Sequence, residues 1–523
     1  MPASAQLAHL CGGRRLFGVK INYFFAFGII ACGLAACSVG PDYKAPEPPM
    51  PASFIAAASS KVASSRAVSS TKWWRTLHDR ELDSLIDRAI AGSPTLEIAL
   101  NRIQQARAQE AVIVGAALPA AGASEGGALG TGSDLARSRV SQPLVSAENG
   151  AGFTRVTNIV GFDAGWEIDI FGRFRRAIEA AQYDVDAAMA ARNMVLISLV
   201  ADVTRAYLDL RALQMQVAVL RKNIDVARKY VDFVHERYNR GITNELDVTL
   251  AQRELAQLQA QVAPLVARID AARYVIAVLL GEFPENLDKK LARPGILPAL
   301  PARIRSGLPI DLLRRRPDVV EAERQLASAN AQIGVATADL FPRVVLIGSL
   351  GWQQGIGQTA AAINPIWSVG PGAVAPLLDF GRLDAIVEKA DFRNRELLLN
   401  YKQTVLNAVR EVDTAVDAYA ALQNRLRHLA DALTAAQRAV TLATERFDRG
   451  LTDSLNVIDA QRQEFEIEQQ YVSAQESAAA ELVTLYKSLG SGWEDYQVFA
   501  PIPPPLPAIA AAFKSLVAPN PAR

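Results

Sequence analysis

The chain carries the octapeptide ERYNRGIT at residues 236–243 and a near copy of it, ERFDRGLT, at residues 445–452, an offset of 209 positions. The same offset relates two further tripeptides to their copies: FGR at 171–173 and 380–382, and AQR at 251–253 and 460–462. The two stretches therefore align from the first match to the last without a gap. Self-similarity at a fixed offset indicates an internally repeated architecture.

Both copies show the apolar pattern of coiled-coil helices. All 13 positions of the pattern, spaced three or four apart, are apolar in both copies, and in the first they are Leu196, Leu199, Val203, Ala206, Leu210, Leu213, Val217, Leu220, Ile224, Ala227, Val231, Val234 and Tyr238. A pattern of this length predicts long packed helices rather than short globular ones. A shorter apolar seam follows from Val248 to Leu279, and Pro264 is expected to bend it. Each copy thus predicts an antiparallel helical hairpin.

The two predicted hairpin turns have the same chemistry. A glycine follows each long helix at the position that favours a left-handed backbone. The threonine two residues later, or Asn244 and Asp453 after it, can cap the next helix. The arginine before each glycine lies where a cation complements a helix C-terminus. The tip residues are Arg240, Gly241 and Thr243 in the first hairpin and Arg449, Gly450 and Thr452 in the second.

The N-terminus has the layout of a secretory signal peptide. Basic residues precede an apolar stretch of 16 residues at 21–36, which ends in small residues. The sequence LAAC at 34–37 resembles a bacterial lipobox, so we expect cleavage before Cys37 and acylation of this residue. The alternative is a short membrane anchor with an incidental cysteine, although the stretch is short for a bilayer of about 30 Å. Ser38, rather than an aspartate, follows the cysteine, which in lipoproteins generally implies sorting to the outer membrane.

The composition argues against some classes of protein. The formal net charge of the 523 residues is +1, which is not that of a strongly basic nucleic-acid-binding protein. Cys11 and Cys32 would leave with the signal and Cys37 would carry lipid, so the mature chain is expected to lack disulfides. No run of about 20 apolar residues follows the signal. A membrane crossing by the mature chain would therefore use β-structure.

Segments before the long helices alternate between apolar and small or polar residues, as β-strands do. Residues 160–170 place apolar side chains on one face, and 344–352 and 367–377 behave similarly. A poorly patterned partner strand is expected within 118–144. A sheet of a soluble protein with one solvent-exposed face would show the same alternation. If the four strands enter lipid, they are too few for the smallest barrels of about eight strands, so several chains must share one barrel, and three chains would give 12 strands.

The most specific stretch of the chain contains GLP at 307–309, DLLRRRPD at 311–318, EAERQL at 321–326, ANA at 329–331 and FP at 341–342. It resembles the TolC and OprM class of outer-membrane efflux channels, in the lipoprotein branch often called NodT-type. The resemblance extends from Trp73 to Trp493.

The resemblance implies a fold class and a function. The fold would be that of an α+β membrane protein, with long antiparallel coiled-coil helical hairpins in an α-barrel and four transmembrane β-strands per protomer contributing to a 12-stranded trimeric β-barrel. The function would be that of an outer-membrane exit duct in a tripartite efflux system of the resistance-nodulation-division type. The duct would passively export small toxic compounds.

The resemblance also implies partners and a location. The chain would form a homotrimer, contact a periplasmic adaptor through its hairpin tips and serve an inner-membrane pump. It would be held in outer-membrane lipid by acylated Cys37 and extend into the periplasm. Nucleic acid is not an expected partner.

A periplasmic gate is a further implication. Matching residue by residue puts three second-copy residues, spaced four and three apart and so on one helical face, at the constriction. Two residues of the first copy match them, but Leu250 stands where Asp459 does. Without the resemblance, Asp459 and Arg462 would be interpreted as an ordinary surface pair. The expected gate residues are Leu455, Asp459, Arg462, Leu246 and Arg253.

The chain is expected to divide into five parts. These are a lipoprotein signal peptide at 1–36, a lipid-anchored tether at 37–72, a first repeat of a helix, two strands and a hairpin at 73–300, a second repeat at 301–495, and a Pro- and Ala-rich tail at 496–523.

Other classes of function have less support in the sequence. An enzyme is disfavoured because His78, His235 and His428 have no companions at metal-ligand spacing, and no nucleophile-elbow or P-loop motif occurs. We therefore expect no catalytic residue, cofactor or metal. A periplasmic lipoprotein adaptor would have hairpins but neither aromatic alternating strands nor a double repeat. An outer-membrane component of a type I secretion or metal-efflux system is the alternative within the channel class, and the cargo cannot be read from the sequence.

Overall fold

The computed structural model describes residues 38–51, 55, 71–126, 156–286, 291, 294–301, 310, 313, 315–356 and 363–496. The predicted signal peptide, Cys37, most of the predicted tether and the tail after residue 496 lie outside these ranges. The chain forms two compact units. The strand unit contains the residues up to Asp42, Ile113–Ile178 and Ala331–Ala390, and the helical unit contains Tyr43–Val112, Glu179–Asn330 and the residues from Asp391 onward.

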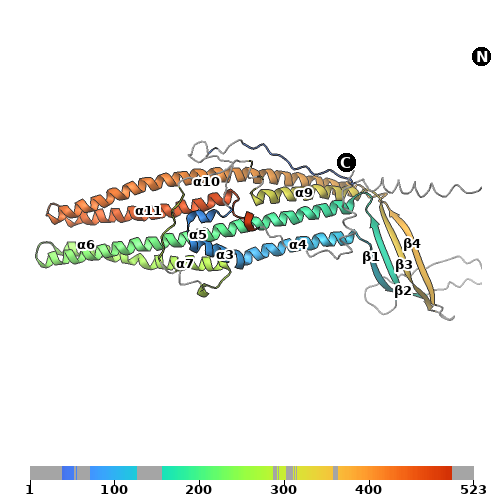
Figure 1. Ribbon diagram of the computed structural model, residues 1–523, viewed down its shortest axis with the longest axis horizontal. Helices are drawn as coiled ribbons and strands as arrows, with labels where there is room; N and C mark the ends of the chain where they lie inside the picture. The colour runs from blue at the N-terminus through green and yellow to red at the C-terminus, as the bar shows by residue number, and fades with distance from the viewer. Residues whose placement is uncertain are drawn as a thin grey trace, which may run out of the picture. The chain divides into compact units, whose positions relative to one another are not determined.

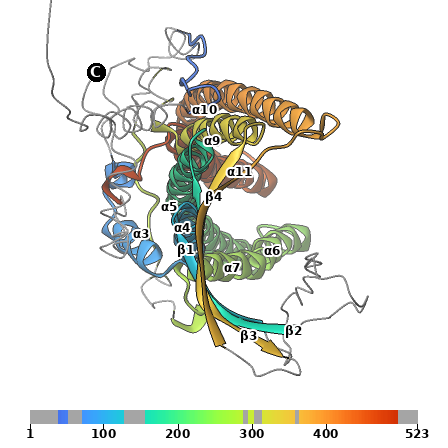
Figure 2. The same cartoon turned by 90° about the vertical axis from the view of Figure 1, so that its right-hand side faces the viewer.

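The strand unit contains a four-stranded antiparallel sheet in the order β1-β2-β3-β4 (Figure 2). Its strands are β1 (Ala120–Gly126), β2 (Val156–Ile168), β3 (Arg343–Ile356) and β4 (Ile363–Val374). A strand occurs at each of the four predicted places, including the poorly patterned partner, which is β1. The predicted limits of the three patterned strands differ from the observed ones at every end. β2 and β4 each begin four residues earlier than predicted and stop two and three residues earlier, and β3 begins one residue earlier and extends four residues further.

Glycines let β2 and β3 approach each other closely. Gly161 pairs with Gly351 across the two strands. A Cβ atom on Gly161 would lie 2.6 Å from the carbonyl oxygen of Leu350, so a side chain there would force the backbone to shift. Gly165, on the same face of β2, has no such neighbour within 4 Å.

Two long helices, α5 (Arg173–Asn239) and α10 (Arg382–Asp448), each contain 67 residues, and their first residues are 209 positions apart (Figure 1). Each is followed by a helix that returns antiparallel to it. After α10 this is α11 (Ser454–Ser488), and after α5 it is α6 (Glu245–Ala260) with α7 (Val262–Leu280). The break between α6 and α7 lies at Gln261, because the ring of Pro264 leaves the carbonyl of Ala260 without its helical donor. The predicted bend is therefore confirmed.

The helices α4 (Pro94–Ala116) and α9 (Pro317–Ala338) reveal a part of the duplication that the 209-residue offset does not include. Both helices begin at a proline, and both are followed by a second proline before a strand: Pro94 and Pro119 in the first copy, Pro317 and Pro342 in the second. Both pairs of prolines are 223 positions apart. Proline suits the first helical position because the missing N–H would have no partner there.

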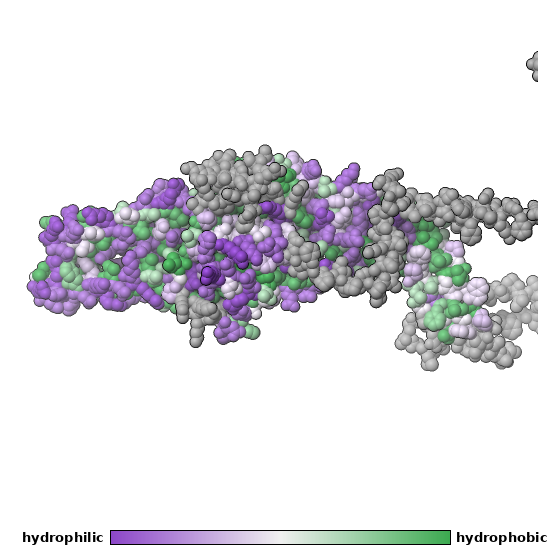
Figure 3. Space-filling view, in the orientation of Figure 1, coloured by the Kyte–Doolittle hydropathy of each residue, from purple (hydrophilic) through white to green (hydrophobic). Residues whose placement is uncertain are grey.

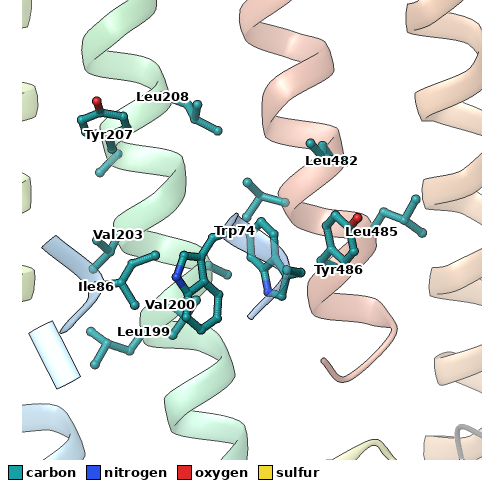
Figure 4. Packing of buried hydrophobic residues seen from close by; sticks show 14 of the residues in the cluster. Trp74, Ile86, Leu199, Val200, Val203, Tyr207, Leu208, Leu482, Leu485 and Tyr486 are labelled. Carbon is teal, nitrogen blue, oxygen red and sulfur yellow. The ribbon is translucent and has the colours of Figure 1, made fainter. Parts of the chain in front are cut away.

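The core of the helical unit joins both hairpins to the segment before them, which contains η1 (Trp73–Leu77) and α3 (Arg80–Gly92). The ring of Trp73 stacks on Tyr486 of α11 with centroids 4.7 Å apart. Trp74 lies between apolar side chains of α5 and α11 (Figure 4). The short turns η2 (Pro284–Asn286) and η3 (Glu494–Tyr496) complete the described elements.

The arginine-rich stretch at 311–318 has a structural role. Arg316, with only 6% of its side chain exposed, donates to Asp318 and Glu411 at 2.6 and 2.8 Å and to the carbonyl oxygen of Ser488 at 3.0 Å. These bonds tie the start of α9 to α10 and to the end of α11. Hydrogen bonds from Arg316 to Asp318 and Glu411 raise its pKa against the effect of burial, so the guanidinium stays charged.

One helix among the described residues, α5, contains an 18-residue window apolar and long enough to cross a membrane by composition alone. However, 56% of that window is buried inside the molecule. The apolar residues of α5 that are part of the core include Leu196, Val200 and Val203. Packing within the helical unit therefore accounts for the apolar window.

Candidate functional site

One face of the sheet is apolar and open to the surroundings. Along one row across three strands, Phe162 of β2 pairs with Leu350 of β3, which pairs with Trp367 of β4. These side chains are 60%, 58% and 76% exposed. The hydrophobic surface over the strands is visible in Figure 3. The remaining large apolar residues exposed on this face are Val160, Ile168, Leu346, Trp352 and Val369.

The opposite face of the sheet carries mostly small and polar residues, and its large exposed apolar side chains are Ile347 of β3 and Val374 of β4. Asp163 pairs with Ser349, whose hydroxyl lies 2.7 Å from the hydroxyl of Ser368. Gly161, Gly165 and Gly351 also lie on this face, because each is two residues from Asp163 or Ser349 along its strand. A sheet with one apolar and one polar face, each several strands wide, can separate lipid from a water-filled interior.

The two outer strands of the sheet have unpaired edges among the described residues. β1 pairs only with β2, and β4 pairs only with β3. An unpaired edge leaves a row of backbone N–H and C=O groups without partners, which water tolerates and hydrocarbon does not. A sheet of this size can therefore enter lipid only if other strands cover both edges.

The two hairpin tips have nearly identical backbones. Gly241 and Gly450 adopt φ of 71° and 72°, as predicted for left-handed residues. In each tip the N–H of the following residue, Ile242 or Leu451, bonds to a carbonyl five residues earlier at 2.9 Å. This is the Schellman ending of a helix, which satisfies carbonyls that the helix leaves free.

The structure decides which residues cap the returning helices. The N-caps are Asn244, whose side chain accepts the N–H of Asp247 at 3.1 Å, and Asp453. Thr243 and Thr452 are therefore not the caps. The Thr243 hydroxyl instead donates to the carboxylate of Asp247. In the second tip, the Thr452 hydroxyl accepts a bond from Asn456.

The predicted gate residues lie within the first three turns of α6 and α11. Leu246 and Leu455 are 63% and 58% exposed, and Asp459, Arg462 and Arg253 are exposed as well. The surface pair of Asp459 with Arg462 does not form, because Arg462 bonds to Glu466 at 3.4 Å. No described hydrogen bond or ion pair brings these five residues together within one chain.

A hydrogen-bonded junction that the sequence analysis missed joins the two hairpins near their tips. The hydroxyl of Ser454, the first residue of α11, donates to Asp247 of α6 at 2.7 Å. The hydroxyl of Tyr230 of α5 donates to the Ser454 carbonyl oxygen at 3.2 Å. Hydrogen bonds from the Thr243 and Ser454 hydroxyls lower the pKa of Asp247, whereas burial raises the pKa of Tyr230 to about 12. The one feature of the sequence that could have pointed to this junction is Asp247, which is acidic whereas its counterpart in the second copy, Asn456, is neutral.

Aromatic packing supports the same junction. Phe447 of α10, only 7% exposed, lies 6.0 Å from the ring of Phe233 of α5. The guanidinium of Arg237 lies 4.7 Å from the centroid of Phe447 and 5.7 Å from that of Phe233. The two hairpins are therefore held together by apolar, cation–π and hydrogen-bond contacts just inside their tips.

The segment directly after Cys37 is packed against the strand unit. Arg176, with 6% of its side chain exposed, donates to the carbonyl oxygen of Val39 at 3.2 Å and to Asp42 at 2.7 Å. Gly40 adopts φ of 94° and rests on Gly334, and a Cβ on Gly40 would lie 2.5 Å from the Gly334 Cα. Val39, Gly40 and Asp42, which come shortly after the predicted acylation site, are thus held against α5 and α9.

The described residues contain no group of three or more His, Cys, Asp or Glu side chains that could hold a metal ion. The described residues thus present two separate features, a sheet with one exposed apolar face and a pair of hairpin tips joined to each other.

Comparison with known proteins agrees with this arrangement. The sequence profile described as outer membrane efflux protein matches residues 85–282 and 308–491. The pyoverdine export outer membrane protein OpmQ of Pseudomonas aeruginosa is 31% identical over 81% of this chain and 88% of its own length. Nodulation protein T of Rhizobium leguminosarum bv. viciae is 29% identical over 83% and 87% of the respective lengths. The structure of the outer-membrane channel OprN superposes with a TM-score of 0.77 at 34% identity, covering 87% of this chain and 100% of OprN. The chain therefore belongs to the outer membrane efflux protein family.

Proposed function

We propose that three copies of this chain form one exit duct, in which 12 strands close a barrel in the outer membrane and the helical hairpins continue the passage into the periplasm. The family makes the chain an efflux channel of the outer membrane. We propose four things beyond this: the trimer, the shared barrel, the acylation of Cys37 and the identity of the partners.

The observation that carries the proposal is the amphipathic four-stranded sheet with two unpaired edges. Its exposed apolar face, which includes Trp352 and Trp367, would lie against lipid, and its face of glycine, serine and Asp163 would line the lumen. Because β1 and β4 both lack outer neighbours, each sheet needs a copy of itself on either side. A closed ring of identical chains meets this need.

The gate would lie at the periplasmic end of the duct. In a trimer, the exposed Leu455 and Asp459 of each chain would face the threefold axis, where Leu455 forms an apolar constriction and three Asp459 carboxylates form an acidic ring that attracts cations. Arg462, Leu246 and Arg253 would complete the gate. The acidic ring would come from the second hairpin alone, because Leu250 replaces the aspartate in the first.

The hairpin tips would receive the periplasmic adaptor, and the pump would supply the energy. Both tips present an exposed arginine and glycine, Arg240 with Gly241 and Arg449 with Gly450, at the ends of the longest helices. The tip threonines Thr243 and Thr452 would be part of the same contact. The inner-membrane partner would be a pump of the resistance-nodulation-division type. The duct itself would catalyse no reaction, and its cargo would be small toxic compounds.

Lipid attached to Cys37 would hold the chain in the outer membrane. Arg176, Gly40 and Gly334 fix the segment that begins at Ser38, so the acyl group would enter the membrane beside the strand unit.

The experiment that tests the proposal is expression in a Gram-negative host with separation of the two membranes. We expect the processed chain in the outer-membrane fraction, as a trimer band that disappears on heating. Purified material should form channels in planar bilayers. Recovery with the inner membrane, or the absence of conductance from intact trimers, would contradict the proposal. Mutation of Cys37 to Ser tests the lipid anchor separately.

A further inference from the structure

The return helix of the first hairpin is broken, whereas that of the second is continuous. α6 ends at Ala260 and α7 begins at Val262, and the two helices follow one another along α5 (Figure 1). At the break, the N–H of Gln261 bonds to the carbonyl oxygen of Leu258 at 3.2 Å, three residues back instead of the helical four. In the second hairpin, α11 runs for 35 residues without a break.

The internal repeat identifies the residue that causes the break. At the offset of 209, Gln261 corresponds to Gln470 of α11, and Pro264 corresponds to Ser473. The two glutamines are alike, so the difference lies in the proline, which has no N–H to donate and whose ring presses on the preceding turn. The second hairpin therefore shows the form that the first would take with an ordinary residue at position 264.

The long helix of the first hairpin has a second weak point beside the break. Ile224 of α5 belongs to a small buried cluster with Leu258 of α6, so this turn of α5 lies next to the break. The side-chain amide of Asn223 donates to the carbonyl oxygen of Val219 at 2.8 Å and so competes with the backbone for that acceptor. The counterpart of Asn223 in α10 is Ala432, which has no such group.

The return helix is thinly packed around the break. The structure describes all of residues 259–275, and none of them is buried within the chain. The matching stretch of α11, residues 468–484, has six buried side chains, which are those of Val472, Ala474, Ala478, Ala479, Leu482 and Val483. Few buried contacts and solvent-exposed backbone hydrogen bonds are typical of the parts of a protein that open at low free-energy cost.

The two sides of the break are held by different parts of the molecule. Beyond it, Ile276, Ala277 and Leu280 of α7 belong to the main core of the helical unit. On the side of the tip, Asp247 of α6 accepts a hydrogen bond from the hydroxyl of Ser454, in the second hairpin, at 2.7 Å. A movement of the second tip would therefore pull on α6 while the core retains α7, and the change in backbone angles would fall on the break between them.

We infer that the first hairpin contains a hinge, formed by residues 261–264 and Asn223, about which its tip turns when the duct opens, while the second hairpin moves as a continuous rod. The inference rests on the proposed duct and adds how its periplasmic end opens. Hinges of this kind consist of a few residues that absorb a change in φ and ψ. The hinge lets the gate residues Leu246 and Arg253 follow those of the second hairpin without disturbing the core.

Replacement of the proline tests the hinge. Pro264→Ala supplies the missing donor for the carbonyl oxygen of Ala260 and favours helix, so the variant should fold with α6 and α7 joined into one helix. Pro284→Ala removes a proline from η2, outside the hinge, and is the matched control. Hydrogen exchange of residues 259–268 in the purified full chain measures the hinge itself, and the frequency of channel opening in planar bilayers measures its use.

We expect Pro264→Ala to slow exchange in this stretch about tenfold and to lower the opening frequency several-fold, in trimers of unchanged mass. We expect Pro284→Ala to match the wild type in both measurements. Exchange as fast as in the wild type, or slowed exchange with unaltered opening, would overturn the hinge and leave the proposed duct standing. Wild-type trimers that do not conduct would overturn both.

Discussion

At the scale of single residues, Asp459 is distinguished by its exposure and lack of a described partner. Arg462, one helical turn away, is bonded to Glu466 instead. A carboxylate repeated around a threefold axis would attract cations and resist anions at a narrow point. Its effect should therefore be visible in ion flow rather than in folding.

The prediction for Asp459 is that Asp459→Ala raises single-channel conductance in planar bilayers and weakens any preference for cations. Asp431→Ala, which removes an exposed carboxylate from α10 outside the gate, serves as the control and should leave both unchanged. Unaltered conductance in Asp459→Ala would remove this residue from the gate.

Asp247 is predicted to stabilise the hairpin junction in a pH-dependent way. Its pKa is lowered by the Thr243 and Ser454 hydroxyls, so the stabilisation is present above the ordinary aspartate pKa of about 3.9 and is lost as the pH falls through the lowered value. Asp247→Asn should cost about 1 kcal/mol of stability at pH 7. The gap in Tm between wild type and this variant should shrink as the pH is lowered from 7 to 3.

The control for Asp247 is its repeat counterpart. Asn456 bonds to Thr452 within its own tip, so Asn456→Ala should show no such pH-dependent gap. A gap that stays constant or widens on acidification would show that the Asp247 carboxylate does not stabilise the junction.

At the scale of elements, the approach of β2 to β3 depends on glycine. Gly161→Ala would place a Cβ 2.6 Å from the Leu350 carbonyl oxygen and should destabilise the sheet by about 1–3 kcal/mol. Gly165→Ala meets nothing within 4 Å and should be tolerated. The temperature at which the trimer band dissociates on gels is the measurement, and equal temperatures for the two variants would refute the close contact.

Much of the element structure could be predicted from the sequence, because its signals are local and periodic. The heptad pattern predicts α5 and α10, the two glycines predict both turns, and Pro264 predicts the break after α6. A helix at the start of each repeat was expected, but the 223-residue offset that relates α4 to α9 was missed. The interval from Pro119 to Phe171 is 52 positions, whereas that from Pro342 to Phe380 is 38, so the additional residues shift the offset.

The hairpin junction could not be predicted, because it depends on distant parts of the chain. Ser454 and Asp247 are 207 positions apart, and Tyr230 and Ser454 are 224 apart. No pattern along the sequence records such a pairing. Arg316 is a similar case, since its partners Asp318, Glu411 and Ser488 come from three helices, and its motif indicated the family rather than this role.

At the scale of the whole molecule, the proposed function makes one chain an incomplete membrane protein. Among the described residues, its four strands leave two backbone edges unpaired and its exposed tryptophans have no cover. Burial in lipid removes the free-energy cost of exposing the apolar face to water. It raises the free-energy cost of the open edges, because their backbone N–H and C=O groups find no hydrogen-bond partners in hydrocarbon. Both requirements are met together only when sheets from several chains join edge to edge.

The most direct test of this claim is the mass of the protein extracted from outer membranes in mild detergent, measured by native mass spectrometry. We predict a single species with the mass of three chains, which falls to one chain only after denaturation. A folded species with the mass of one chain under the same conditions would contradict the shared barrel.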